Sequence, residues 1–130
     1  MNSFRIQKTS FFVLSMLLAC ALAACSSRFD GSRIGNDSGL IMQYAVFNQT
    51  DTQDLTAEAG DILAADIVVE AGSLSVRIQK AGEASIYDAD LTASERFELE
   101  LEESGTYTVT VTGKHTKGSL SFTVRTNPEE

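Results

Sequence analysis

Four glutamates stand close together in the second half of the chain, at Glu98, Glu100, Glu102 and Glu103. Alternate residues of a β-strand lie about 6.6–6.8 Å apart on one face, a separation at which two carboxylates can act as general acid and general base in glycoside hydrolysis. That chemistry also needs a cleft that raises the pKa of one carboxyl group. Because these glutamates alternate with apolar residues, we interpret them as the solvent-exposed face of a strand. We predict that the protein is not an enzyme.

Aspartates could supply oxygen ligands to a calcium ion. They gather in two places, Asp88 with Asp90, and Asp51 with Asp54 and Asp61. Neither group has the spacing of an EF-hand loop, so we interpret them as solvated turn residues and predict no metal site and no cofactor. A calcium-binding surface module is kept as an alternative.

The segment from Gly113 to Gly118 is the one cationic stretch of an acidic chain, and it holds the only histidine. Lys114, His115 and Lys117 are candidates for contact with phosphate or with an acidic partner. The alternative is an ordinary hairpin loop. One histidine cannot build a multi-histidine metal site.

The net charge argues against nucleic acid as a partner. The whole chain carries −8 at pH 7. Without Arg5 and Lys8 near the N-terminus, eight basic residues remain of the 10 in the chain, against 18 acidic ones, and the net charge becomes −10. A surface of this sign repels a phosphate backbone.

The N-terminal segment has the composition of an export signal. Arg5 and Lys8 precede an apolar run from Phe11 to Leu22, about a dozen residues, which is within the range of a signal-peptide core. A membrane-spanning helix needs about 20 apolar residues, so we do not interpret this run as a span. The two cysteines of the chain, Cys20 and Cys25, both lie at its end. A disulfide or thiolate site is therefore impossible beyond residue 25.

The segment Leu22-Ala23-Ala24-Cys25 resembles a bacterial lipobox, the motif cut by lipoprotein signal peptidase. The resemblance implies that Cys25 is acylated and becomes the first residue of the mature chain. It also implies that the three residues before Cys25 fill the peptidase subsites. The partner would then be the cell membrane or the outer membrane, with the domain outside the cytoplasm. Cys20 is a weaker candidate, and a secretory signal that merely contains cysteines is the alternative.

Residues 40–130 alternate apolar and polar side chains with a period of two, which is typical of half-buried antiparallel strands. Strands are expected within 40–47, 63–69, 74–78, 84–88, 97–101, 107–111 and 120–124. The fold class we predict is all-β: a small antiparallel β-sandwich of about seven strands, jelly-roll-like. Residues 1–24 would be the signal peptide, residues 25–39 the lipidated cysteine and a flexible tether rich in Ser and Gly, and residues 40–130 the sandwich. It stays open whether Phe29 and Ile34 pack on the domain.

The last two strands can be placed in register as a hairpin. Pairing Thr112 with Ser119 sets Val111 opposite Leu120, and every facing pair then matches in polarity. The stretch Gly105–Gly113 and the strand after it resemble the end of bacterial pre-peptidase C-terminal-type domains and related jelly-roll sandwiches. That resemblance covers about residues 60–125 and implies an accessory or binding module.

These patterns favour a non-catalytic lipoprotein of the cell envelope that binds an unknown envelope protein or glycan. A glycan-binding surface module is the alternative, because hydroxyl side chains alternate along the expected outer face of the final hairpin. They are Thr108, Thr110, Ser121 and Thr123. The chain has no tryptophan for a sugar platform.

Overall fold

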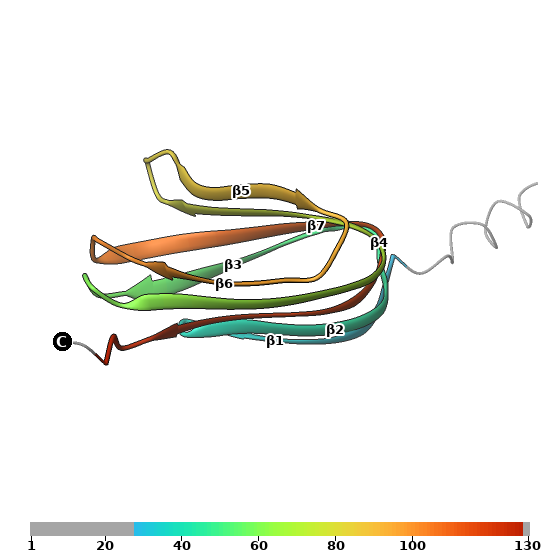
Figure 1. Cartoon of the computed structure of the whole chain (residues 1–130), viewed down its shortest axis with the longest axis horizontal. Coiled ribbons are helices and arrows are strands. Elements are labelled where there is room, and N and C mark those ends of the chain that lie inside the picture. The colour runs from blue at the N-terminus through green and yellow to red at the C-terminus, as the bar shows by residue number, and fades with distance from the viewer. Residues whose placement is uncertain (1–27, 129–130) are drawn as a thin grey trace, which may run out of the picture.

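The computed structural model describes residues 28–128, which form seven strands that all pair antiparallel in one sheet (Figure 1). In chain order the strands are β1 Phe29–Asn36, β2 Gly39–Phe47, β3 Thr50–Ala57, β4 Ile62–Lys80, β5 Ser85–Leu91, β6 Glu95–Glu100 and β7 Gly105–Arg125. The predicted all-β, antiparallel fold class is confirmed. No helix long and apolar enough to cross a membrane occurs in the described range.

Two long strands hold the fold together. β4 has 19 residues and β7 has 21, and they pair with each other from Ile62–Arg125 at one end to Lys80–Tyr107 at the other. The first half of β4 and the second half of β7 pair with β6 and β2, and β1 adds to β2. The other halves pair with β5 and β3. Because both long strands bend at the same level, the single sheet folds over into two facing layers (Figure 1).

The bend is produced by backbone conformations that ordinary residues avoid. Gly72 in β4 has φ +74°, and a Cβ there would lie 2.3 Å from the carbonyl oxygen of His115. Opposite it, His115 in β7 has φ 51°, in the left-handed region. The register of the β4–β7 pair also shifts on both sides of Ala71, and such bulges sharpen the local bend. We call this region, with the start of β1 beside it, the bend end.

The core lies between the two layers and is built from the inward side chains of every strand except β1, β5 and β6, which contribute at its margins. The residues whose side chains are less than 2% exposed include Leu40, Met42, Phe47, Leu55, Leu63, Ile67, Leu74, Val76, Ile78, Leu101, Leu120 and Phe122. Tyr87 of β5 and Phe97 of β6 stack with ring centroids 4.2 Å apart. This pair closes one open side of the sandwich.

Arg33 of β1 closes the opposite side. Its Nε donates to Asp51 Oδ2 at 2.8 Å, and its Nη2 donates to the Thr52 carbonyl and to Gln53 Oε1, both at 3.0 Å. Gln53 in turn donates from Nε2 to the Asn36 carbonyl. Polar residues on the inner side of β3 therefore join the edge strands of the two layers.

The expected flexible tether differs from the structure. The composition of residues 25–39 predicted a linker, but residues 29–36 form β1 and pair with β2 along their whole length. Phe29 packs edge-on against Phe47, with ring centroids 5.9 Å apart, whereas the Ile34 side chain is 66% exposed. The sequence did not predict this strand, because every residue after Phe29 is exposed and the segment therefore lacks a regular alternation of apolar and polar residues.

The predicted final hairpin is wrong. Thr112 does not face Ser119, because β7 continues as one strand through the bend at Gly113–Gly118 and its two halves lie in different layers. Val111 faces Val76 and Leu120 faces Ile67 instead. Polarity matching could not reveal this, since β4 offers the same alternation of apolar and polar residues as the supposed hairpin partner.

Candidate functional site

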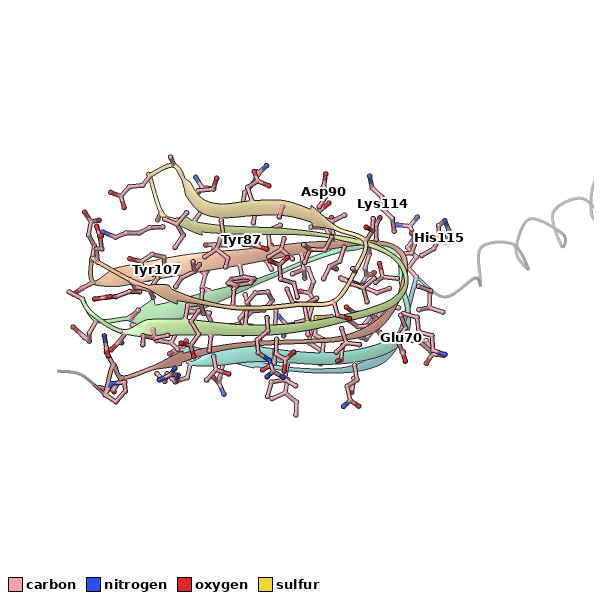
Figure 2. The ribbon with its side chains drawn as sticks, viewed as in Figure 1. Glu70, Tyr87, Asp90, Tyr107, Lys114 and His115 are labelled. Atoms are coloured by element: carbon pink, nitrogen blue, oxygen red, sulfur yellow. The ribbon has the colours of Figure 1, made fainter. Side chains whose placement is uncertain are left out.

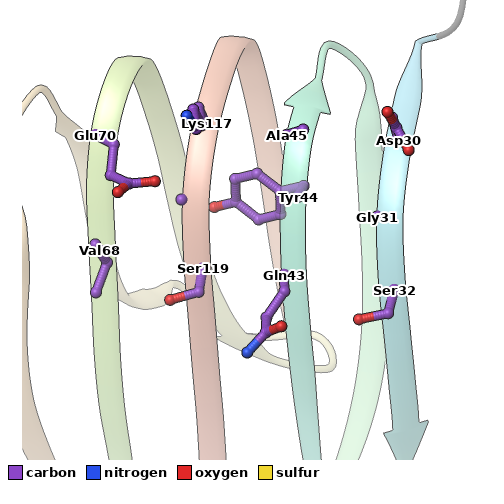
Figure 3. A pocket seen from close by; sticks show the side chains of 11 residues that line it. Asp30, Gly31, Ser32, Gln43, Tyr44, Ala45, Val68, Glu70, Lys117 and Ser119 are labelled. Atoms are coloured by element: carbon purple, nitrogen blue, oxygen red, sulfur yellow. The ribbon is translucent and has the colours of Figure 1, made fainter.

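Two shallow hollows lie along the outer face of the second half of β7, one near the bend end (Figure 3) and one further from it, and together we call them the β7 groove. Its floor is made of small residues, Gly118, Ser119, Ser121 and Thr123. Near the bend end the floor is low because Gln43 of β2 and Glu70 of β4 carry longer side chains on either side of it, whereas the second hollow lies beside Arg96 and Glu98 of β6. The hollow near the bend end is therefore a consequence of small residues on one strand, and both hollows are open to solvent.

The walls near the bend end are polar and carry both signs of charge. Gln43 comes from β2, Glu70 and Val68 from β4, and Lys117 from β7 itself (Figure 3). Of the three contact residues predicted from the sequence, Lys117 lines this groove, whereas Lys114 and His115 do not. Amide, carboxylate and ammonium groups together can donate and accept hydrogen bonds to a polar ligand.

Two ion pairs border the region of the β7 groove away from the bend. Arg96 Nη2 lies 2.9 Å from Asp66 Oδ2, and both side chains are at least half exposed. Arg125 of β7 pairs with Glu98 of β6, across β4. Exposed pairs of this kind contribute little to stability. They leave charged groups at the rim that a partner can reach.

Tyr44 lies beneath the bend-end part of the groove and is 4% exposed. Its hydroxyl is buried and has no hydrogen-bond partner within residues 28–128. Burial raises the pKa of Tyr44 to about 12, because the charged phenolate would lose its hydration. The phenol stays neutral at physiological pH, and its hydroxyl is an unsatisfied polar group in the core.

The three residues of the predicted contact loop lie together at the bend of β7. Lys114 and Lys117 pair with Ser73 and Ala71 of β4, and His115 lies between them. All three side chains are exposed. The buried side chain of Thr116 fixes the backbone of this segment, because its hydroxyl donates to the Ser73 carbonyl and accepts from the Lys114 amide. The contact residues thus stand on a fixed bend between layers.

The acidic residues considered as catalytic or calcium-binding groups are dispersed and mostly partnered. Glu98 and Glu100 lie on β6, and Glu103 lies in the turn before β7, where Lys80 donates to it at 2.8 Å. This hydrogen bond lowers the pKa of the Glu103 carboxyl group. Within residues 28–128 no three His, Cys, Asp or Glu side chains gather closely enough to hold a metal ion.

The aspartates were interpreted as turn residues, and most of them are strand residues instead. Asp51 and Asp54 lie on β3, and Asp88 and Asp90 on β5. Asp51 binds Arg33, as described above. Asp54 accepts from Thr108, Asp88 pairs with Arg77, and Asp90 accepts from Ser75. Asp61 alone lies in a turn, between β3 and β4, where it accepts from the Glu58 amide.

The four hydroxyl residues considered for glycan binding are divided between the two layers. Ser121 and Thr123 lie in the β7 groove, whereas Thr108 and Thr110 face outward from the other layer beside β3. Gln43, Val68 and Glu70 could not be identified as groove residues from sequence, because strand pairing alone brings them to the site. The lipobox residues Leu22, Ala23, Ala24 and Cys25 lie outside the described range.

No family model matches the chain, and no curated protein matches it either. Among solved structures, the periplasmic lysozyme inhibitor PliG of Aeromonas hydrophila is 15% identical with a TM-score of 0.47, over 75% of this chain and 88% of that one. TmCBM61, solved with β-1,4-galactotriose, is 14% identical with a TM-score of 0.42, over 75% and 70%. The CENP-C protein of Drosophila melanogaster bound to CAL1 is 13% identical with a TM-score of 0.38, over 85% and 95%. Likeness at this level assigns no function to the chain.

Proposed function

We propose that this protein is a bacterial lipoprotein whose acylated Cys25 anchors a non-catalytic binding module of the cell envelope. The anchor is supported by the short apolar run that ends in the lipobox-like segment. One acyl chain gives only marginal membrane binding, whereas the two or three chains of a bacterial lipoprotein anchor hold a protein stably. The binding role is supported by the β7 groove, which is the observation that carries the proposal.

The form of the β7 groove suits an extended partner. Small residues of β7 from Gly118 to Thr123 line its two hollows, and the rim near the bend end offers an amide at Gln43, a carboxylate at Glu70 and an ammonium group at Lys117. Small-molecule sites are usually deep, mostly apolar cavities, whereas this surface is shallow and open to solvent. The partner we propose is a segment of another envelope protein that lies along β7.

A glycan is the second candidate. The hydroxyls of Ser119, Ser121 and Thr123 on the groove floor favour it, because sugars offer many matching donors and acceptors. The structure gives no comparable support to a calcium-binding role, since the aspartates considered for it are dispersed over β3, β5 and one turn.

The anchor is tested by membrane fractionation with labelled palmitate. Cys25→Ser should abolish the label and either release the protein from membranes or leave an uncleaved precursor. Cys20→Ser is the matched control and should behave as the wild type. Palmitate on the Cys25→Ser form would contradict the anchor.

The groove is tested by filling it. Ser121→Trp places a large ring on the floor between Ile41 and Asp66, while Thr110→Trp makes the same kind of change on the outer face of the other layer. Partners captured from envelope extract and binding to a glycan array are compared for both variants. Ser121→Trp should reduce binding at least about tenfold, and Thr110→Trp should not. Equal binding by the two variants would remove the β7 groove as the site.

A further inference from the structure

The bend end lies directly beside the start of the folded domain. The Asn48 amide donates to the Arg28 carbonyl at 2.8 Å, and the Asn48 side chain accepts from the His115 amide at 3.1 Å. Phe29 faces Phe47, which faces Thr116 in the bend. Figure 2 accordingly shows Lys114 and His115 at the end of the sandwich where β1 begins.

The position of β1 leaves very little chain between the proposed anchor and the domain. Only Ser26 and Ser27 separate Cys25 from Arg28. Three residues at full extension span about 10 Å, whereas the expected tether of about 14 residues would reach roughly 20 Å. A lipid on Cys25 would therefore hold the bend end within about one Debye length, about 8–10 Å, of the lipid headgroups.

Charge is distributed unevenly between the two ends of the sandwich. At the bend end, Arg28, Lys114 and Lys117 are exposed, and none of them forms a salt bridge within residues 28–128. Acids also lie at this end, among them Asp30 and Glu70 beside Lys117, and Asp90 beside Lys114 (Figure 2). The turns at the opposite end carry the acids Asp37, Glu58, Asp61, Glu83, Glu102 and Glu103. Lys80 at that end is engaged by Glu83 and Glu103.

We propose that the bend end docks on the anionic phospholipid headgroups of the membrane that holds the anchor. This inference rests on the proposed lipidation of Cys25. Lys114 and Lys117, with Arg28, contact the headgroup phosphates, and the acidic end is repelled outward, so the sandwich stands upright. The β7 groove then begins near the membrane at Lys117 and runs away from it towards Thr123, where a partner in the envelope can enter.

The docked orientation is measured with the mature lipidated protein in vesicles of phosphatidylcholine, with and without phosphatidylglycerol. Ala71→Cys carries a fluorophore at the bend end, and Glu102→Cys carries it at the acidic end. Lipids with a nitroxide on the headgroup quench a fluorophore that lies at the membrane surface. In the anionic vesicles, the fluorophore at position 71 should be strongly quenched and the one at position 102 only weakly.

Charge removal tests which residues make the contact. Each lysine near an anionic surface should change the ratio of docked to undocked molecules about fivefold, so Lys114→Gln with Lys117→Gln should lower it roughly 25-fold. Arg77→Gln with Arg125→Gln removes the same charge elsewhere and should leave quenching at position 71 unchanged.

Two different failures can be told apart in the same experiment. If the protein floats with the vesicles but quenching at position 71 is the same with and without phosphatidylglycerol and with and without the lysine substitutions, the docking proposal is overturned. The proposed anchor is still supported in that case. If the protein does not float with either kind of vesicle, the anchor is wrong and the docking proposal falls with it.

Discussion

Arg33 should be worth more to stability than any other arginine of the described domain, because it joins two strands that are not hydrogen-bonded neighbours. β1 and β3 are the edge strands of opposite layers, and the Arg33 guanidinium bridges them through Asp51, Thr52 and Gln53. The Arg33 side chain is 32% exposed and that of Asp51 is 21% exposed. The bridge is thus partly shielded from solvent.

The magnitude follows from these contacts. Hydrogen bonds that involve a charged group contribute about 1.5–3 kcal/mol when buried, and partial exposure lowers this value. Loss of three such bonds, with the methylene packing kept in Arg33→Met, should cost about 2 kcal/mol. For a domain of about 100 residues that corresponds to a fall in Tm of about 8–16 °C.

The assay is thermal and urea unfolding followed by far-UV circular dichroism. Arg77→Met is the matched control, because Arg77 and Asp88 are 3.4 Å apart and both side chains are more than half exposed. The control should lose less than about 0.5 kcal/mol. A double-mutant cycle of Arg33→Met with Asp51→Asn should show coupling of about 1 kcal/mol. Equal losses for the two arginine variants would refute the role of Arg33 as a bridge between layers.

Two further substitutions probe the bend and the core. Gly72→Ala should lower the free energy of unfolding by about 3 kcal/mol or more, because the new Cβ would clash with backbone atoms. Gly82→Ala is the control, since Gly82 has a similar φ of +79° with nothing within 4 Å of the new Cβ, and it should lose only about 1 kcal/mol. Similar urea midpoints for the two variants would contradict the bend geometry. Tyr44→Phe should raise the free energy of unfolding by up to about 1 kcal/mol at neutral pH, because it removes an unsatisfied buried hydroxyl. Because the pKa of Tyr44 is raised to about 12 in the folded protein, stability that is present below pH 10 is lost as the pH rises towards 12. Tyr44→Phe should lose less stability over this pH range. A Phe variant that is less stable than the wild type at neutral pH would contradict the unsatisfied hydroxyl.

The strands with clear alternation were predictable from sequence, and their connections were not. β2 and the two halves of β4 and β7 lie where the period of two placed them. The two halves of each long strand were separated in the prediction because glycines between them look like turns. Gly72 and Gly113 instead mark a bend within a continuous strand, and single-sequence patterns do not distinguish a bend from a reversal.

The two strands that were missed carry polar residues on the side that faces the other layer. In β3, Asp51 and Gln53 occupy inward positions where apolar residues would be expected, so apolar residues mark the inward face only at Leu55 and Ala57. Arg33 in β1 is the reason for this exception, since it needs polar partners across the gap between layers. The β7 groove could not be foreseen, because its walls come from strands far apart in sequence.

The claim that Cys25 carries lipid immediately before β1 is tested most directly by the intact mass of the protein extracted from membranes. We expect a chain that begins at Cys25 and carries the added mass of a diacylglyceryl group and its acyl chains. A membrane-extracted form that begins at another residue, or that carries no lipid, would contradict both the anchor and the short span between membrane and sandwich.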